Sequence, residues 1–369
     1  MINNLIPEGF KDDVTSQVAT EHKFKDIIIN HFQSNGYDLV KTPLVEFFNQ
    51  DESNNVFQVL SKKGEKLIIR DDITLQVARL SKTRLSKKKL PLRLCYYGEV
   101  VRKKGTMLRP ERQFLQIGAE CIGANSFLAD VEMMELAYSS LSLVGIKNIT
   151  LEVSSRIFFD NFIDNIKNLN IKKELQRLIR IKNLKEICNL IDLNKQNYIK
   201  DLFSCTGLYE DKKVNLNKLA INVNTSNEVD NIKNIIKNFS HNNKKVNIFL
   251  DLCEVDDKNY HSGVRFTFFA NDVRGEIARG GRYLIAGSDE GNIGTGFTCY
   301  MDTILRASDR KKIEKKILIP FDTSKIKISH LFKKNYSIVR YMGKKKISKK
   351  ITKDQRCQFF LENNSITKV

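Results

Sequence analysis

The sequence lacks the features that mark several classes of protein. It has no run of about 18 apolar residues, and MINNLIPEGFKDD at its start lacks a charged segment followed by an apolar one. We therefore expect a cytoplasmic protein without a membrane partner. The seven cysteines form no CxxC pair, so neither a zinc site nor a disulfide framework is readable. No phosphate-loop or dinucleotide glycine fingerprint follows an expected strand, and we expect no cofactor.

The charge balance is strongly basic, with a net charge of +19. Clustered lysines and arginines bind nucleic acid by releasing counterions from phosphates. Here the lysines alternate with asparagine and isoleucine along the chain, as in NNIKNIIKNFSHNNKK, which favours solvated surface over a single basic stripe. With 369 residues and 41% hydrophobic content, the chain is long enough for two or three domains with a buried core.

The first part of the chain predicts a helix, several strands and a hairpin. Residues 15–35 have apolar side chains at helical spacing and end at Gly36. GYDLVKTPLVEFF alternates up to Pro43, which indicates a strand end or edge. VFQVL and KLIIR flank SKKGE and predict a hairpin, and DDITLQVARLSKT predicts a helix with an acidic start. LRLCYYGEVV and RQFLQIGAECIG predict two strands joined by a basic loop, followed by the helix FLADVEMMELAYSSLSLVG.

The rest of the chain predicts a sheet that is interrupted once. After the strand ITLEVS, residues 156–245 have helical periodicity broken by asparagine-rich turns, and strands resume at VNIFLDL, YHSGVRFTFFA, EIARGGRY and NIGTGFTCY. Neighbouring strands with one helical block favour an α+β fold with a mostly antiparallel sheet. We expect a first domain over residues 1–310 and a short α/β segment over 311–369, large enough for a strand and one or two helices.

Polar side chains stand out within this apolar pattern. Gln116 and Glu120 are four residues apart on an expected strand, so both leave the same face. A carboxylate on a buried face is unfavourable unless it is paired, and for Glu120 alone an internal salt bridge with an arginine or lysine is slightly favoured over a ligand. Likewise, Asp71 and Asp72 are more often plain residues of a helix start, and His261 a satisfied core histidine. No Ser–His–Asp or metal-ligand spacing is present.

Across nearly all of its first 305 positions, the chain resembles the histidyl-tRNA synthetase family. PEGF, GYDLVKTPLVE, IRDDITLQVARL, GEVVRKKGTMLRPERQFLQIGAECIG, YHSG, GGRY and IGTGF occur in the family's order and spacing. This resemblance implies the class II aminoacyl-tRNA synthetase fold, a mostly antiparallel sheet flanked by helices, and a dimer formed through the segment around Pro43.

The resemblance also implies a pocket for histidine. Asp72 and Thr74 match the positions that hold the α-ammonium group, with aspartate in place of the family's glutamate. Gln116 and Glu120 match the residues that contact the amino acid and its imidazole. Tyr260 matches the first residue of the family's Tyr-Tyr pair, and His261 replaces the second tyrosine. Arg102 matches the arginine that binds the ATP phosphates in the family's second motif.

Although the pocket residues are kept, the resemblance implies that the residues needed for adenylate formation are lost. Lys104 replaces the glutamate that holds adenine in the second motif, and Asp256 aligns with the histidine-specific catalytic arginine. Thr303 replaces the arginine of the third motif, which orders the γ-phosphate. Removing one positioned cation from such a reaction lowers the rate by a factor of about 100 or more. The tail is also too short for the family's anticodon-binding domain, so we expect no tRNA partner.

A synthetase fold with a histidine pocket and without ATP chemistry is similar to the regulatory subunits of ATP phosphoribosyltransferase, which are paralogues of the synthetase in histidine biosynthesis. This resemblance implies a non-catalytic subunit in a hetero-oligomer, with a short-form catalytic subunit as partner and L-histidine as feedback effector. Two alternatives remain open: a histidyl-tRNA synthetase with degenerate motifs, and an RNA-binding protein that uses the same scaffold and its charge of +19.

Overall fold

The computed structural model describes residues 5–14, 16–48, 56–164, 166–209, 214–253, 261–285, 293–309, 315–334, 336–362 and 365–369. The chain divides into two compact units, which include Gln17–Arg310 and Lys311–Val369 respectively. Each unit has its own sheet and its own hydrophobic core. Among the described residues, no helix combines the length and apolar character needed to cross a membrane.

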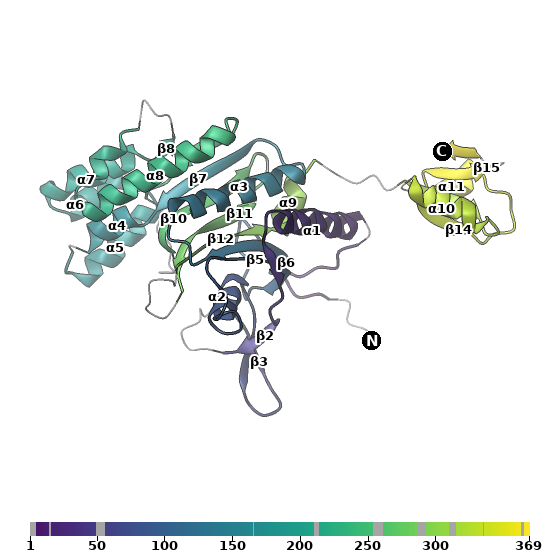
Figure 1. Cartoon of the computed structure of the whole chain (residues 1–369), viewed down its shortest axis with the longest axis horizontal. Helices are drawn as coiled ribbons and strands as arrows, with labels where there is room; N and C mark the ends of the chain where they lie inside the picture. The colour runs from purple at the N-terminus through teal and green to yellow at the C-terminus, as the bar shows by residue number, and fades with distance from the viewer. Residues whose placement is uncertain are drawn as a thin grey trace. The chain divides into compact units, whose positions relative to one another are not determined.

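The larger unit is built on a wide, mostly antiparallel sheet (Figure 1). Within the described residues it has nine strands in the order β1-β5-β6-β12-β11-β10-β7-β9-β8. The pairs β1–β5 and β7–β9 are parallel, and the other neighbours are antiparallel. The strands are β1 (Asp38–Val40), β5 (Leu92–Val101), β6 (Gln113–Ile122), β7 (Ile149–Ser155), β8 (Gly207–Leu208), β9 (Asn247–Leu250), β10 (His261–Ala270), β11 (Ala278–Leu284) and β12 (Ile293–Tyr300).

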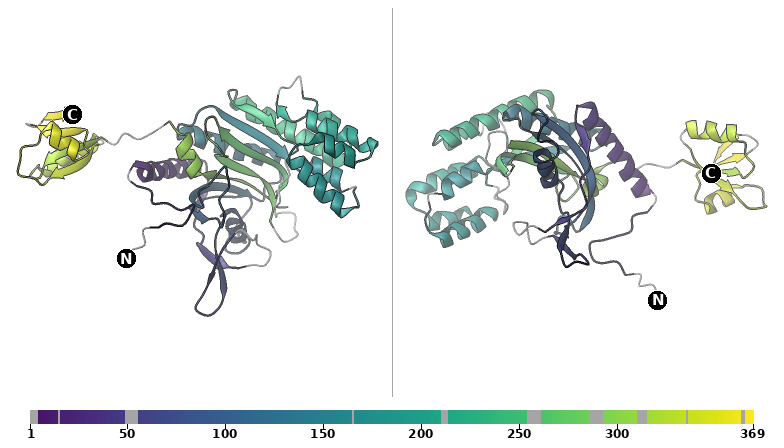
Figure 2. Two further views of the ribbon diagram at one scale, coloured as in Figure 1. Left: turned by 180° about the vertical axis from the view of Figure 1, so that it is seen from behind. Right: turned by 60° about the horizontal axis from the view of Figure 1, so that its bottom comes forward.

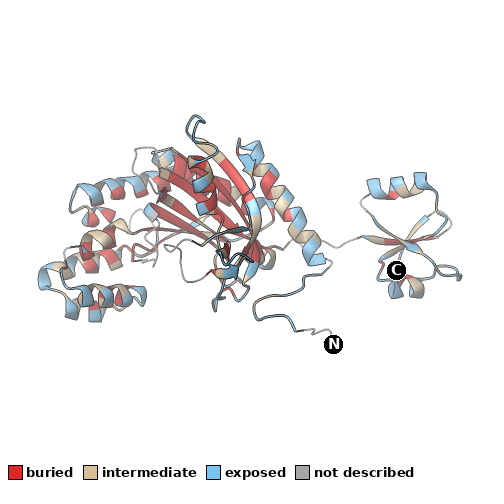
Figure 3. Ribbon diagram, turned by 90° about the horizontal axis from the view of Figure 1, so that it is seen from below, coloured by how far each residue is buried: buried red, intermediate tan, exposed pale blue. Residues whose placement is uncertain are grey.

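Helices cover both faces of this sheet, and its central strands β6 and β12 are buried along nearly their whole length. On β6, Ile117, Ala119 and Cys121 belong to the main core, which also contains buried residues of α1 (Ser16–Ser34) and α3 (Phe127–Leu143). Alternate residues of β6 face the other way, where α2 (Thr74–Lys82) packs, and a short helix α9 (Met301–Ala307) follows β12. Figure 3 shows the strands as buried and the outer sides of the helices as exposed. The predicted class II-like α+β fold is confirmed.

The segment between β7 and β9 is helical and lies beside that end of the sheet (Figures 1 and 2). The longest helix, α8, begins with a capping box in which Asn222 and Thr225 bond each other's backbone N–H groups. The same segment contains the two-residue strand β8, which pairs with β9. The sequence did not predict this strand, because two residues are too few to show a periodic pattern. The helices are α4 (Ile157–Ile163), α5 (Leu169–Arg180), α6 (Leu184–Leu190), α7 (Leu193–Ser204), the 3-10 helix η1 (Leu216–Leu219) and α8 (Val223–Asn242).

The predicted hairpin is present in a second, small sheet of the larger unit. Its strands β2 (Val45–Phe47), β4 (Lys66–Ile69) and β3 (Phe57–Leu60) pair antiparallel in the order β2-β4-β3. Phe47 is 70% exposed and Leu60 is 73% exposed. The small sheet therefore presents apolar side chains to solvent near Pro43.

The smaller unit has more strands than the sequence predicted. Where one strand was expected, the described residues form four, in the order β14-β13-β15-β16, with two helices. Ile317 and Ile319 are buried in one small core, and Leu318 and Phe360 in another. The extra strands are only four or five residues long and lie among lysines, so their alternation is weak. The elements are β13 (Lys316–Pro320), α10 (Lys325–Lys333), β14 (Ser337–Tyr341), α11 (Lys349–Asp354), β15 (Phe359–Glu362) and β16 (Ser365–Lys368).

Two leucines of α3 provide a matched test of the main core. Leu141 is 0% exposed and Leu128 is 55% exposed. We expect Leu141→Ala to lower the free energy of unfolding by about 2–5 kcal/mol, because it leaves a cavity. The same change at Leu128 should lower it by less than about 0.5 kcal/mol. Urea unfolding followed by circular dichroism measures both, and equal effects would contradict this assignment of the core.

Candidate functional site

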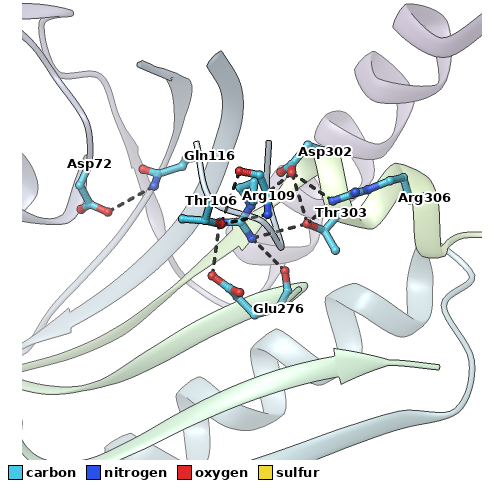
Figure 4. Close-up of polar contacts among 8 residues, drawn as sticks. All are labelled: Asp72, Thr106, Arg109, Gln116, Glu276, Asp302, Thr303 and Arg306. Atoms are coloured by element: carbon cyan, nitrogen blue, oxygen red, sulfur yellow. Dashed lines mark hydrogen bonds and ion pairs between the residues drawn. The ribbon is translucent and has the colours of Figure 1, made fainter. Parts of the chain in front are cut away.

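The start of α2 and the middle of β6 are joined by hydrogen bonds. Asp72 accepts from the backbone N–H of Thr74 at 2.7 Å and from the Gln116 amide at 3.2 Å. The Gln116 carbonyl in turn accepts from the N–H of Ile73 at 3.2 Å. Figure 4 shows the Asp72–Gln116 bond. Gln116 therefore fixes the orientation of the Asp72 carboxylate and ties the helix start to the strand.

Glu120 lies fully buried on the same face of β6, surrounded by hydroxyl groups. The Tyr283 hydroxyl donates to its carboxylate at 2.8 Å, and the Tyr96 hydroxyl donates at 3.3 Å. Tyr96 also bonds Thr298 at 2.8 Å and Thr74 at 3.1 Å. The interpretation of Glu120 as one half of an internal salt bridge is wrong for the described part of the chain, where its hydrogen-bond partners are phenols.

Glycines on the neighbouring strands make room for this cluster. A Cβ atom at Gly296 would overlap the Glu120 carboxylate, and one at Gly118 would overlap the Tyr96 phenol. The register places Gly296 directly opposite Glu120. In the sequence the glycine pair of GGRY indicates only a turn or a close backbone approach. In the structure a Cβ atom at Gly280 would overlap the backbone carbonyl of Gly296 on the neighbouring strand.

Burial has a large effect on the proton affinity of this cluster. Desolvation raises the pKa of Glu120 from 4.5 to about 8, although hydrogen bonds from Tyr283, Thr74 and Tyr96 oppose the shift. Burial also raises the pKa of Tyr96. Glu120 therefore takes up or releases a proton near neutral pH, where its charge state responds to any group that binds beside it.

The cluster forms one end of a cavity of about 270 Å³. Three acidic and three basic side chains line it, so its charges are balanced. Arg102 lies with its guanidinium carbon 5.0 Å from the centre of the Phe114 ring and 5.9 Å from that of Tyr300. The lining residues are Asp71, Asp72, Thr74, Leu75, Arg102, Lys104, Thr106, Glu120, Arg279, Gly280, Gly281, Tyr283, Gly296, Phe297, Thr298 and Tyr300.

The structure brings most of the predicted pocket residues together. Four of them line the cavity, namely Asp72, Thr74, Arg102 and Glu120, and Gln116 supports Asp72 from the side. Tyr260 and Asp256 lie outside the described residues. Of His261, only the backbone is described, at the start of β10 opposite Tyr283. The described residues contain no group of three or more His, Cys, Asp or Glu side chains placed to bind a metal.

Beside the cavity, the loop between β5 and β6 is fastened by Arg109. This side chain is 3% exposed and lies 3.8 Å from the centre of the Tyr300 ring. It donates to Asp302 at 3.2 Å and to the Glu276 carbonyl at 3.0 Å. Thr303 is fully buried in the same cluster (Figure 4).

Sequence reasoning missed Arg109, Tyr96, Tyr283 and Arg279. Arg109 is one of several cations in a basic loop, and nothing in the sequence distinguishes it from its exposed neighbours. Tyr283 stands in GGRY, but its approach to Glu120 depends on strand pairing across β12, which no local pattern encodes.

Comparison with known proteins gives this site its context. A model of the histidyl-tRNA synthetase family matches residues 9–304. The chain is 31% identical over 332 residues to the ATP phosphoribosyltransferase regulatory subunit of Rhodospirillum centenum, covering 86% of this chain and 84% of that protein. This chain belongs to the family of ATP phosphoribosyltransferase regulatory subunits. The ATP phosphoribosyltransferase regulatory subunit of Clostridium botulinum is 27% identical over 367 residues, covering 94% of this chain and 85% of that protein.

Solved structures agree with this family in fold. An ATP phosphoribosyltransferase regulatory subunit/histidyl-tRNA synthetase from Bacillus halodurans superposes with a TM-score of 0.78 at 21% identity, covering 96% of this chain and 97% of that one. A chain of the ATP phosphoribosyl transferase (HisG:HisZ) complex from Thermotoga maritima gives a TM-score of 0.61 at 19% identity, covering 76% and 97%. The family is one of regulatory subunits in histidine biosynthesis, as the sequence resemblance implied.

The raised pKa of Glu120 predicts how stability depends on pH. The folded protein keeps a proton that the unfolded chain releases above about pH 4.5, so the contribution of this group is full below 4.5 and is lost as pH rises through about 8. Over that range we expect the free energy of unfolding to fall by at most about 1.4 kcal/mol per pH unit from this group. Glu120→Gln should remove that slope.

Urea unfolding at several pH values checks this expectation. Glu186→Gln on α6 is the matched control, because Glu186 is exposed and should leave the slope unchanged. A slope that persists in Glu120→Gln would show that other groups cause it.

Proposed function

We propose that this regulatory subunit binds free L-histidine in the cavity and thereby controls a short-form ATP phosphoribosyltransferase catalytic subunit. The proposal rests on one observation: a buried carboxyl, Glu120, and a pre-oriented carboxylate, Asp72, meet at one small cavity. An amino acid with a basic side chain can offer its α-ammonium group to Asp72 and its side chain to Glu120. Carboxylates without such partners are unfavourable when buried, so the cavity favours a ligand that supplies them.

Each predicted residue then has a role at the ligand. Asp72 accepts from the α-ammonium group, beside the hydroxyl of Thr74, and Gln116 holds Asp72 in place. Glu120 accepts from the imidazole. Its pKa near 8 lets it pair with either protonation state, since it can be a donor when protonated and an acceptor when ionised. The family resemblance assigns Arg102, Tyr260 and His261 to the rest of the ligand.

Several features argue against adenylate chemistry at the same place. Lys104 lines the cavity where the synthetase resemblance implies an adenine-binding glutamate. Thr303 accepts hydrogen bonds from Arg306 at 3.3 Å and from Arg109 at 3.5 Å. Arg109 also contacts the carboxylates of Asp302 and Glu276, so this cation is neutralised internally. A transferring phosphate would have to compete with both carboxylates.

Regulation requires that histidine prefer one state of the assembly. A ligand that binds two states equally shifts nothing, and couplings between sites are commonly about 1–3 kcal/mol. The catalytic subunit is proposed as the partner because the relatives are called ATP phosphoribosyltransferase regulatory subunits. The similar structure from Thermotoga maritima is described as a HisG:HisZ complex. We further propose a cytoplasmic dimer formed around Pro43, where the exposed Phe47 and Leu60 offer apolar surface.

Calorimetry with L-histidine tests the pocket. We expect the wild type to bind and Glu120→Ala to lose at least about 30-fold in affinity, because truncating one partner of a buried charged pair costs about 2–5 kcal/mol. Glu186→Ala, a change at an exposed site on α6, should bind as the wild type does. Unchanged affinity in Glu120→Ala would remove this pocket from the proposal.

Co-expression with a short-form catalytic subunit tests the regulatory role. We expect the two chains to co-purify, activity to appear only in the pair, and histidine to inhibit it in the wild type but far less in Glu120→Ala. Histidine-dependent ATP–pyrophosphate exchange by the chain alone would instead support a synthetase.

A further inference from the structure

Arg279 is a cation of the cavity wall that the family resemblance does not explain. It lies on β11 opposite Thr298 of β12, and Thr298 bonds the Tyr96 hydroxyl that donates to Glu120. Gly281 and Tyr283 follow at two-residue steps, so all three side-chain positions face the cavity. Arg279 therefore shares one wall with Tyr283, whose hydroxyl donates to Glu120.

The charges of the cavity come from separate elements. Its acidic groups come from the start of α2 and from β6, and its basic groups are Arg102, Lys104 and Arg279. Such a distribution suits a zwitterion, which presents a cation to one side and an anion to the other. A purely anionic ligand would have no cation to offer the carboxylates of Asp71 and Asp72, which line the same cavity.

Among the three cations, Arg279 is the best placed to hold a carboxylate. Arg102 lies against the faces of two aromatic rings, and Lys104 is exposed on the loop after β5. Arg279 is half-buried on a strand that is paired on both sides, so its position is fixed by the sheet. Its guanidinium group has the fork of N–H donors that matches a carboxylate, and burial strengthens such bonds.

We propose that Arg279 binds the α-carboxylate of the ligand and makes the cavity selective for free α-amino acids over analogues without that group. This inference rests on the proposed histidine function and adds a specificity residue to it. The ammonium group lies at Asp72, the imidazole at Glu120, and the carboxylate at Arg279, so the start of α2, β6 and β11 each bind one group.

Calorimetry with two ligands tests the role of Arg279. L-histidinol keeps the ammonium group and the imidazole of L-histidine but has a hydroxymethyl group in place of the carboxylate. In Arg279→Gln we expect the affinity for histidine to fall about 10- to 100-fold, the range of a charged hydrogen bond, and that for histidinol to change by less than about twofold. Arg279→Lys should lie between, and Arg180→Gln on the exposed side of α5 should match the wild type.

Each outcome decides one claim. Unchanged histidine affinity in Arg279→Gln, or equal losses for both ligands, would overturn the role of Arg279 while leaving the histidine pocket in place. No histidine binding by the wild type would refute the proposed function, and the inference would fail with it. Retained histidinol binding in Arg279→Gln, together with its loss in Glu120→Ala, would support both.

Discussion

The burial of the Glu120 carboxyl group is the constraint on which the site depends. A carboxyl group without solvent needs hydrogen-bond donors, and here the phenols of Tyr96 and Tyr283 supply them from two other strands. A Cβ atom at Gly118 would overlap the Tyr96 ring, one at Gly294 the Tyr283 ring, and one at Gly296 the Glu120 carboxyl group, so the cluster needs glycine at all three positions. One polar side chain therefore dictates the residues at several positions of the sheet. It also holds a pKa near neutrality, because the hydroxyl groups only partly offset the loss of water.

This constraint explains why the groups that hold Glu120 lie mainly on strands. The groups around Glu120 come from paired strands of a sheet that is covered by helices on both faces, so their spacing is set by register. A pre-formed site binds with little loss of side-chain entropy. The loop between β5 and β6 is different: Arg109 fastens it to Asp302 and Glu276, whereas residues 103–108 are exposed. The buried cation of this loop is thus paired internally with two carboxylates.

The sequence predicts the elements better than it predicts the partners of individual side chains. Alternation along β6 puts Gln116 and Glu120 on one face, and α3 ends just before Gly145, as the pattern of its sequence predicts. The tyrosines around Glu120 depend on which strands become neighbours across the sheet, and that is a tertiary property. For the same reason the salt bridge favoured for Glu120 alone was wrong. In the smaller unit, strands of four residues are too short for periodicity to identify.

A regulatory subunit of the proposed kind needs a ligand site whose occupancy changes a free-energy balance, and the buried, titratable carboxyl group of Glu120 is our candidate for it. When a cationic or hydrogen-bonding ligand reaches Glu120, the energy of keeping that group from water is offset by the new partner, and its proton affinity changes at the same time. The sheet extends from β6 and β11, which carry Glu120 and Tyr283, through β10 and β7 toward the helical segment. Under the proposed function, a conformation of the assembly that alters the spacing of these strands would alter the affinity for histidine, and linkage would require the converse.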